Sequence, residues 1–88
     1  MELARKTRHA QRRCKDRGIP EIGIELVQQF GVSRPAGHGA QSYSFDKSGW
    51  KNLESYVGHW QLKTMDRLRK LYIVVSDSGE IITAAFRK

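Results

Sequence analysis

Apolar positions recur at helical spacing through the first third of the chain. One narrow stripe, at about 100° per residue, predicts a helix over about residues 3–17, and it contains Leu3, Thr7, Ala10 and Cys14. Gly18 is well placed to end that helix in a left-handed conformation. A second helix is predicted over about residues 20–30, because Pro20 suits a first helical turn and Gly31 follows the last apolar residue.

Strand patterns follow the two helices. Tyr43 and Phe45 alternate with Ser42 and Ser44, which predicts a half-buried strand over about residues 40–45. Residues 32–39 contain proline and two glycines and are interpreted as a loop or an irregular strand. Two β-rich runs around Asp-Ser-Gly-Glu then predict a hairpin over residues 71–86.

Between these strands, residues 48–69 predict a helical insertion. The apolar positions approximate helical spacing at Trp50, Leu53, Val57, Trp60, Thr64 and Leu68. Asp46 or Ser48 is suited to cap its start. Gly49 and Gly58 are poor helix formers, so the pattern leaves open whether this is one continuous helix.

This order of elements predicts a single α+β domain over residues 1–88. Helices that come before hairpin-connected strands favour an antiparallel sheet, here of about four strands, with the helices packed on one side. The helical insertion would come directly before the C-terminal hairpin. A chain of 88 residues is long enough for one modest core and little more.

The charge of the chain is concentrated at its beginning. Of its 16 lysines and arginines and nine acidic residues, seven basic and two acidic residues fall in residues 1–17. That segment therefore supplies most of the formal net charge of +7. A clustered, arginine-rich field attracts polyanions, although a solvated helix face that keeps a small protein soluble is the alternative interpretation.

Composition also bears on compartment and cofactors. No apolar run approaches the roughly 20 residues that span a bilayer, and no leader-like segment follows the first charges. We therefore expect a cytoplasmic protein without a membrane partner, and the single cysteine, Cys14, suits a reducing compartment. The three histidines show no paired ligand spacing, so we expect no metal and no cofactor.

One row on the first predicted helix combines proton transfer with phosphate binding. His9, Arg13 and Arg17 follow each other at i, i+4 and i+8, about 100° from the middle of the apolar stripe. Imidazole can move a proton near neutral pH, and guanidinium can hold a phosphate through two hydrogen bonds. Arg5 and Arg12 flank this row and are further candidates for binding nucleic acid.

Metal-independent cleavage of RNA needs only a base, an acid and cationic donors for the phosphate. His9 is the candidate base or acid, and Thr83 is a second candidate, because a strand would present its hydroxyl on a sheet face. Tyr43, His38 and Arg87 are further polar candidates. Each has an ordinary alternative: a surface histidine, a β-branched strand residue, or a core aromatic with its hydroxyl at the rim.

The motifs at both ends of the chain resemble a known family. Two motifs, His9-Ala10-x-x-Arg13 through Arg17-Gly18-Ile19 and the terminal Val-Val…Gly79-Glu-Ile-Ile-Thr83 hairpin, are similar to a domain-of-unknown-function family of small bacterial proteins. That family resembles the metal-independent ribonuclease toxins that include barnase, EndoU, certain colicins and RelE. The resemblance implies N-terminal helices on a four-stranded antiparallel sheet with RNA bound across it. It leaves residues 46–70 as an insertion.

Three functions stay open on the sequence alone. The first is a toxin-type ribonuclease in which His9 transfers a proton, Arg13 and Arg17 bind phosphate, and Thr83 positions the substrate. The second is a non-catalytic module that binds nucleic acid or a protein, including an antitoxin-like partner. The third is a globular domain without enzymatic activity, whose charge serves only solubility.

Overall fold

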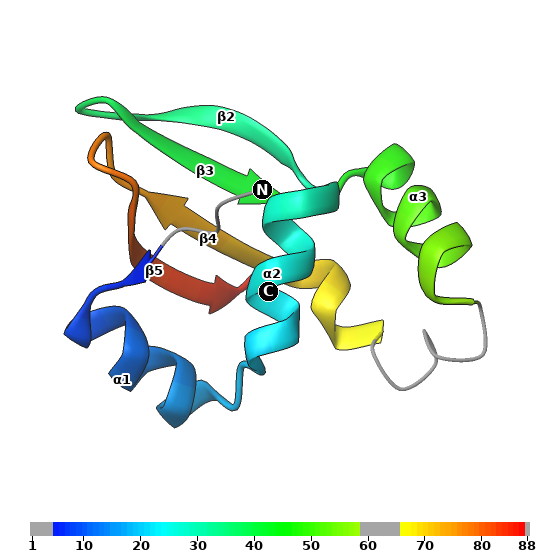
Figure 1. The fold of residues 1–88 in the computed structure, drawn as a ribbon, viewed down its shortest axis with the longest axis horizontal. Helices are drawn as coiled ribbons and strands as arrows, with labels where there is room; N and C mark the ends of the chain where they lie inside the picture. Colours follow the sequence, from blue (N-terminus) through cyan, green and yellow to red (C-terminus); the bar gives the residue numbers. More distant parts are fainter. Residues whose placement is uncertain (1–4, 59–65, 88) are drawn as a thin grey trace.

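The computed structural model describes residues 5–58 and 66–87 and shows an α+β fold (Figure 1). In chain order its elements are β1 (Arg5–Lys6), α1 (Arg8–Arg17), α2 (Glu21–Phe30), β2 (Val32–Gly37), β3 (Ala40–Ser44), α3 (Lys47–Val57), the 3₁₀-helix η1 (Asp66–Lys70), β4 (Leu71–Val75) and β5 (Glu80–Phe86). The predicted fold class is confirmed.

The strands form one sheet in the order β1-β5-β4-β3-β2. Neighbours are antiparallel, except that β1 runs parallel to β5, with Arg5 opposite Glu80 and Lys6 opposite Ile81. The sheet is therefore mixed and has five strands, where about four antiparallel strands were predicted. The predicted hairpin over residues 71–86 is present as β4 and β5.

The first helix begins later than its apolar stripe indicates. Arg5 and Lys6 form β1, and α1 starts at Arg8, while residues 3 and 4 lie outside the described part of the chain. Thr7 sets this start, since its hydroxyl accepts a hydrogen bond from the Ala10 amide at 3.1 Å. Its own amide donates to the Ile81 carbonyl at 3.0 Å, so one residue ends the strand and caps the helix. Gly18 ends α1 at φ 64°, as predicted.

Residues 32–37, interpreted as a loop or an irregular strand, form β2. They pair with β3 in regular register from Val32 opposite Ser44 to Pro35 opposite Gln41, and the register then shifts. The turn that joins the two strands has positive φ at Gly37, His38 and Gly39. Glycine tolerates this conformation without steric cost, which explains why a hairpin forms in a segment rich in loop-forming residues.

Residues 48–69 do not form one unbroken helix. Asp46 caps α3 by accepting a hydrogen bond from the Gly49 amide at 2.7 Å, and α3 ends at Val57, before Gly58 at φ 86°. A short 3₁₀-helix, η1, then leads into β4. Residues 59–65 of the predicted insertion, including Trp60 and Thr64, lie outside the described residues.

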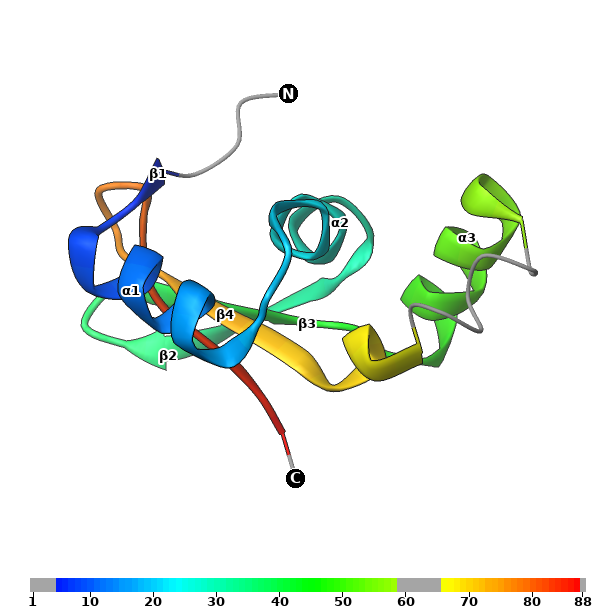
Figure 2. The ribbon, with the colours of Figure 1, turned by 90° about the horizontal axis from the view of Figure 1, so that it is seen from below.

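Both α1 and α2 cover the same face of the sheet. The core lies between them and this face, and its fully buried strand residues include Leu71, Ile73 and Ala84. Figure 2 shows α2 on one side of β3 and β4 and no helix on their other side among the residues drawn as ribbon. α3 packs at one end of the molecule and α1 at the other (Figure 1). The sheet therefore has a covered face and, within residues 5–58 and 66–87, a helix-free face.

Candidate nucleic-acid interface

The predicted row on α1 is exposed and partly held together by its own contact. His9 and Arg13 are both exposed, and the Arg13 Nε donates a hydrogen bond to the His9 Nε2 at 3.2 Å. The imidazole thus acts as the acceptor in this contact, and the remaining guanidinium N–H groups of Arg13 have no hydrogen-bond partner among the described residues. The pair can therefore bind an anion through Arg13 while the imidazole stays beside it.

Arg17 has a different position from the other two members of the row. Its Nη1 donates to the Ala84 carbonyl at 2.9 Å, at the edge of β5 beyond the part paired with β1. Its own carbonyl accepts a hydrogen bond from Arg67 Nη2 at 3.3 Å. Arg17 thus joins the end of α1 to β5, and its guanidinium already has a partner inside the protein.

Most cations of residues 5–17 form no ion pair with an acidic residue of the described chain. Among the described residues the ion pairs are Lys6 with Glu21 and Arg69 with Asp66. The exposed cations of β1 and α1 without an ion pair to any residue in 5–58 or 66–87 are Arg5, Arg8, Arg12, Arg13, Lys15 and Arg17. A field of this kind is not neutralised within the described protein surface and attracts polyanions.

The helix-free face of the sheet contains a second group of side chains that carry hydrogen-bond donors. The register places Arg34 of β2 opposite Ser42 of β3, and Ser44 of β3 opposite Tyr72 of β4. Arg87 follows the end of β5, and its amide donates to the Lys70 carbonyl at 2.7 Å. Since side chains two positions apart share a face, residues from three strands and one strand end meet on this side.

These side chains surround a shallow hollow of about 400 Å³, which we call the sheet hollow. It is lined by Arg34, Ser42, Ser44, Tyr72 and Arg87. All five carry hydrogen-bond donors, and no carboxylate from the described part of the chain lines the hollow. Neither of its arginines forms an ion pair with another described residue. The hollow has the chemistry of a site for phosphate or another oxyanion.

The other predicted site residues fall in three places. Thr83 is half-buried and lies opposite Val74, which is opposite Ser42, so Thr83 shares the face of the sheet hollow. Tyr43 faces the helices and packs against the core. His38 is exposed in the turn between β2 and β3.

The structure therefore separates the two residues predicted to act in catalysis. His9 belongs to α1, which packs on the covered face of β5, whereas Thr83 is on the opposite face of the same strand. Within the described chain, His9 contacts Arg13 and no interaction joins either residue to Thr83. The residues that do share a face with Thr83 are those of the sheet hollow.

Sequence reasoning named Arg87 but missed the other four residues of the sheet hollow. The alternation in residues 41–45 already placed Ser42 and Ser44 on one side, away from Tyr43. The same alternation in residues 71–75 puts Tyr72 on the side opposite Leu71 and Ile73. Arg34 had no such signal, because its strand contains Pro35 and ends at a glycine.

Cys14 lies beneath the basic face of α1 and is 4% exposed. Burial raises the pKa of its thiol above the ordinary value of 9.0, and the charges of Lys6 and Arg17 offset part of that rise. A raised folded-state pKa stabilises the protein fully below the unfolded-state pKa. This contribution is lost as the pH rises from the unfolded-state pKa through the higher folded-state pKa.

We therefore expect Cys14→Ala to lower the free energy of unfolding at neutral pH, and this difference to narrow in alkaline solution. Urea unfolding of both proteins at about pH 7 and about pH 10 measures the change. Lysine and tyrosine titration cancels in the comparison, because both proteins contain the same groups. A difference that stays constant over this range would contradict a buried thiol with a raised pKa.

Metal ligands are not clustered in the described part of the chain. No three histidine, cysteine, aspartate or glutamate side chains there are grouped so that they could hold a metal ion. None of the described helices has the length and apolar character needed to cross a membrane. The resemblance to the ribonuclease-like family stays a prediction, because no family model, no curated protein and no solved structure matches the chain.

Proposed function

We propose that this protein binds single-stranded RNA, with the backbone phosphates held at the sheet hollow. The observation that supports this best is the composition of the hollow on the helix-free sheet face. It contains two serines, a tyrosine and two arginines that form no ion pair with another described residue. A guanidinium group can donate two parallel hydrogen bonds to the oxygens of one phosphate. An open sheet face is also wide enough for an extended strand.

The hydroxyl groups favour RNA over DNA. Ser42, Ser44 and Tyr72 each supply one hydroxyl that can donate or accept a hydrogen bond. The ribose 2′-hydroxyl is itself a donor and an acceptor, and it is the group by which proteins tell RNA from DNA. Tyr72 also offers a half-buried ring on which a base can stack.

The basic face of α1 serves the same proposal as a long-range attractor. Arg8, Arg12 and Lys15 are exposed and form no ion pair with other described residues. Such charges increase the rate of encounter and the salt dependence of binding without reading sequence. In this role His9 and Arg13 add to the field rather than form a reaction centre.

We propose binding rather than cleavage because the hollow lacks a proton-transfer group suited to neutral pH. Its titratable residues are two arginines and one tyrosine, and His9 belongs to the helix that covers the other side of the sheet. A general acid or base must reach within hydrogen-bond distance of the proton it moves. The positions of His9 and Thr83 do not favour such a pair.

The decisive experiment compares two charge-matched double variants by fluorescence anisotropy with a labelled single-stranded RNA. We expect Arg34→Gln with Arg87→Gln to weaken binding roughly tenfold or more, and to reduce the slope of log K against log salt by about 1.4, or about 0.7 for each lost phosphate contact. Lys47→Gln with Lys51→Gln removes the same charge from exposed positions on α3 and is expected to change both values much less.

Equal losses in the two double variants would overturn the sheet hollow as the binding site and leave only general charge attraction. A DNA strand of the same sequence tests the role of the hydroxyls, and we expect it to bind more weakly. RNA incubated with the protein in EDTA should stay intact. Cleavage that produces cyclic-phosphate ends and disappears in His9→Ala would overturn the proposal of binding without cleavage and identify the protein as a ribonuclease.

A further inference from the structure

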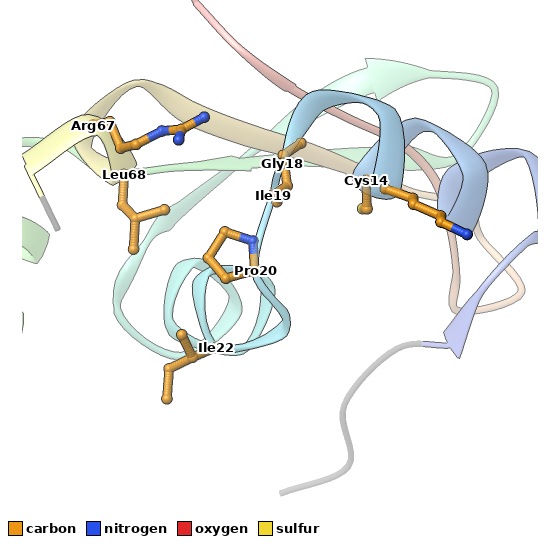
Figure 3. A pocket seen from close by; sticks show the side chains of 8 residues that line it. Cys14, Gly18, Ile19, Pro20, Ile22, Arg67 and Leu68 are labelled. Atoms are coloured by element: carbon orange, nitrogen blue, oxygen red, sulfur yellow. The ribbon is translucent and has the colours of Figure 1, made fainter.

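A second hollow lies on the other side of the molecule, where α1, α2 and η1 meet. We call it the helix pocket. It has a volume of about 380 Å³ and is lined by Cys14, Lys15, Gly18, Ile19, Pro20, Ile22, Arg67 and Leu68. Figure 3 shows Arg67 and Leu68 on one side of it and Cys14 on the other. The volume falls at the small end of the range for small-molecule sites.

The lining of the helix pocket is mainly apolar. Ile19 and Leu68 are 7% and 2% exposed and belong to the core cluster, so they give the pocket a fixed base. Ile22 is 54% exposed, which is unusual for an isoleucine in a helix whose other apolar residues are largely buried. An aliphatic chain in the pocket would cover part of this exposed surface.

Two cations lie at the pocket, and one of them is held in place. Arg67 Nη2 donates to the Arg17 carbonyl, and its guanidinium lies 4.6 Å from the centre of the Phe86 ring. Lys15 is exposed and has no ion-pair partner among the described residues. Lys15 and Arg67 both line the pocket and no carboxylate of the described residues does, so an anion there would meet cations and no acidic side chain.

The nearby helix ends and acids do not cancel this charge. The last carbonyls of α1 are occupied, since Gly18 and Ile19 amides donate to the carbonyls of residues 15 and 14. Three acidic residues adjoin the lining in sequence: Glu21 and Asp66 are paired with Lys6 and Arg69, and Asp16 is exposed but does not line the pocket. The pocket therefore keeps a net positive rim.

We propose that the helix pocket binds a small aliphatic monocarboxylate, with the chain against Ile19, Ile22 and Leu68 and the carboxylate at Lys15 and Arg67. Charge complementarity selects the headgroup, and the apolar lining selects the chain. The site is separate from the sheet hollow and shares no lining residue with it. The inference therefore does not depend on RNA binding.

Octanoate and 1-octanol are the matched probes, because they share a chain length and differ in charge. The readout is the NMR shift of the Ile19, Ile22 and Leu68 methyl groups in the full chain. We expect octanoate to shift all three and to bind more tightly than octanol. Lys15→Gln should weaken octanoate binding roughly three- to fivefold, the effect typical of one exposed ion pair, while Lys51→Gln leaves it unchanged.

A second variant tests the chain separately from the headgroup. Ile22→Asp changes an exposed position, so the fold is retained, and it should abolish the methyl shifts of Ile19 and Leu68 with octanoate. Octanol that binds as tightly as octanoate would overturn the proposal. So would unchanged affinity in Lys15→Gln, or an absence of methyl shifts up to the solubility limit of octanoate.

Discussion

Gly49→Ala is expected to destabilise the protein by about 2–5 kcal/mol, far more than an ordinary surface substitution costs. A methyl group at this position would lie 2.3 Å from the Phe30 carbonyl oxygen and 3.1 Å from the Asp46 Oδ1. The first distance is far inside van der Waals contact, and the atom it meets belongs to the backbone. The end of α2 and the start of α3 would have to separate, and the Asp46 cap would be disturbed.

The sign of this effect distinguishes the structure from helix propensity alone. Alanine is favoured over glycine inside a helix by about 1 kcal/mol, so a propensity argument predicts that Gly49→Ala stabilises α3. Ser48→Ala is the matched control, because Ser48 is the preceding exposed residue of the same helix. We expect this control to change the free energy of unfolding by less than about 0.5 kcal/mol.

Chemical denaturation with urea, followed by circular dichroism, measures both variants. A Gly49→Ala protein as stable as the parent would contradict the close approach of Phe30 to α3. Gly49→Ser should be destabilised at least as strongly, since any side chain begins with the same Cβ atom. The sheet hollow contains no residue of α3, so a Gly49→Ala protein that still folds should keep its affinity for RNA.

Arg17→Met is expected to cost about 1.5–3 kcal/mol, whereas Arg13→Met is expected to cost much less. The difference arises because the Arg17 guanidinium donates to the carbonyl of Ala84, a residue that is fully buried. Methionine keeps much of the side-chain length and removes the donor, so the carbonyl loses its charged partner. Arg13 is exposed and contacts only the neighbouring His9 among the described residues.

The same pair of variants separates stability from binding. Both remove one positive charge from α1, so general attraction for RNA should fall by a similar amount in each. Thermal unfolding should nonetheless show a clearly lower midpoint for Arg17→Met only. Equal stability of the two variants would mean that Arg17 does not tie α1 to β5 in solution.

Local pattern was sufficient to predict most of the regular elements. The apolar periodicity of residues 20–30 and the alternation in residues 40–45 and 71–86 each describe one buried face, and the structure contains α2, β3 and the β4–β5 hairpin there. These elements depend on neighbours a few residues away. The α+β class followed from their order, because helices before hairpin-connected strands have few ways to cover a sheet.

The errors occurred where a distant partner decides the local structure. Arg5 and Lys6 fall within the predicted first helix but form β1, because they pair with Glu80 and Ile81. For residues 32–37 the sequence left a loop and an irregular strand open, and the pairing with β3 decides for the strand β2. A contact across the chain supplies hydrogen bonds that no short window of sequence contains.

The candidate site shows the same limit. His9, Arg13 and Arg17 were grouped correctly on one helix, since i, i+4 spacing is local. Two other features depend on which face of β5 the helix covers. Arg17 donates a hydrogen bond to the Ala84 carbonyl, and Thr83 faces away from α1. Arg34 and Tyr72 meet at the sheet hollow only because β3 lies between their strands in the observed register.

The two attachments of α1 to β5 have a consequence for how its charges act. The amide of Thr7 is bound to Ile81 and the guanidinium of Arg17 to Ala84, so both ends of the helix are fixed to one strand. The backbone entropy lost in placing Arg8, Arg12 and Lys15 is therefore lost during folding rather than on meeting a ligand. The basic helix is therefore preorganised. A polyanion that binds it would restrict the rotamers of the basic side chains but not the backbone of the helix.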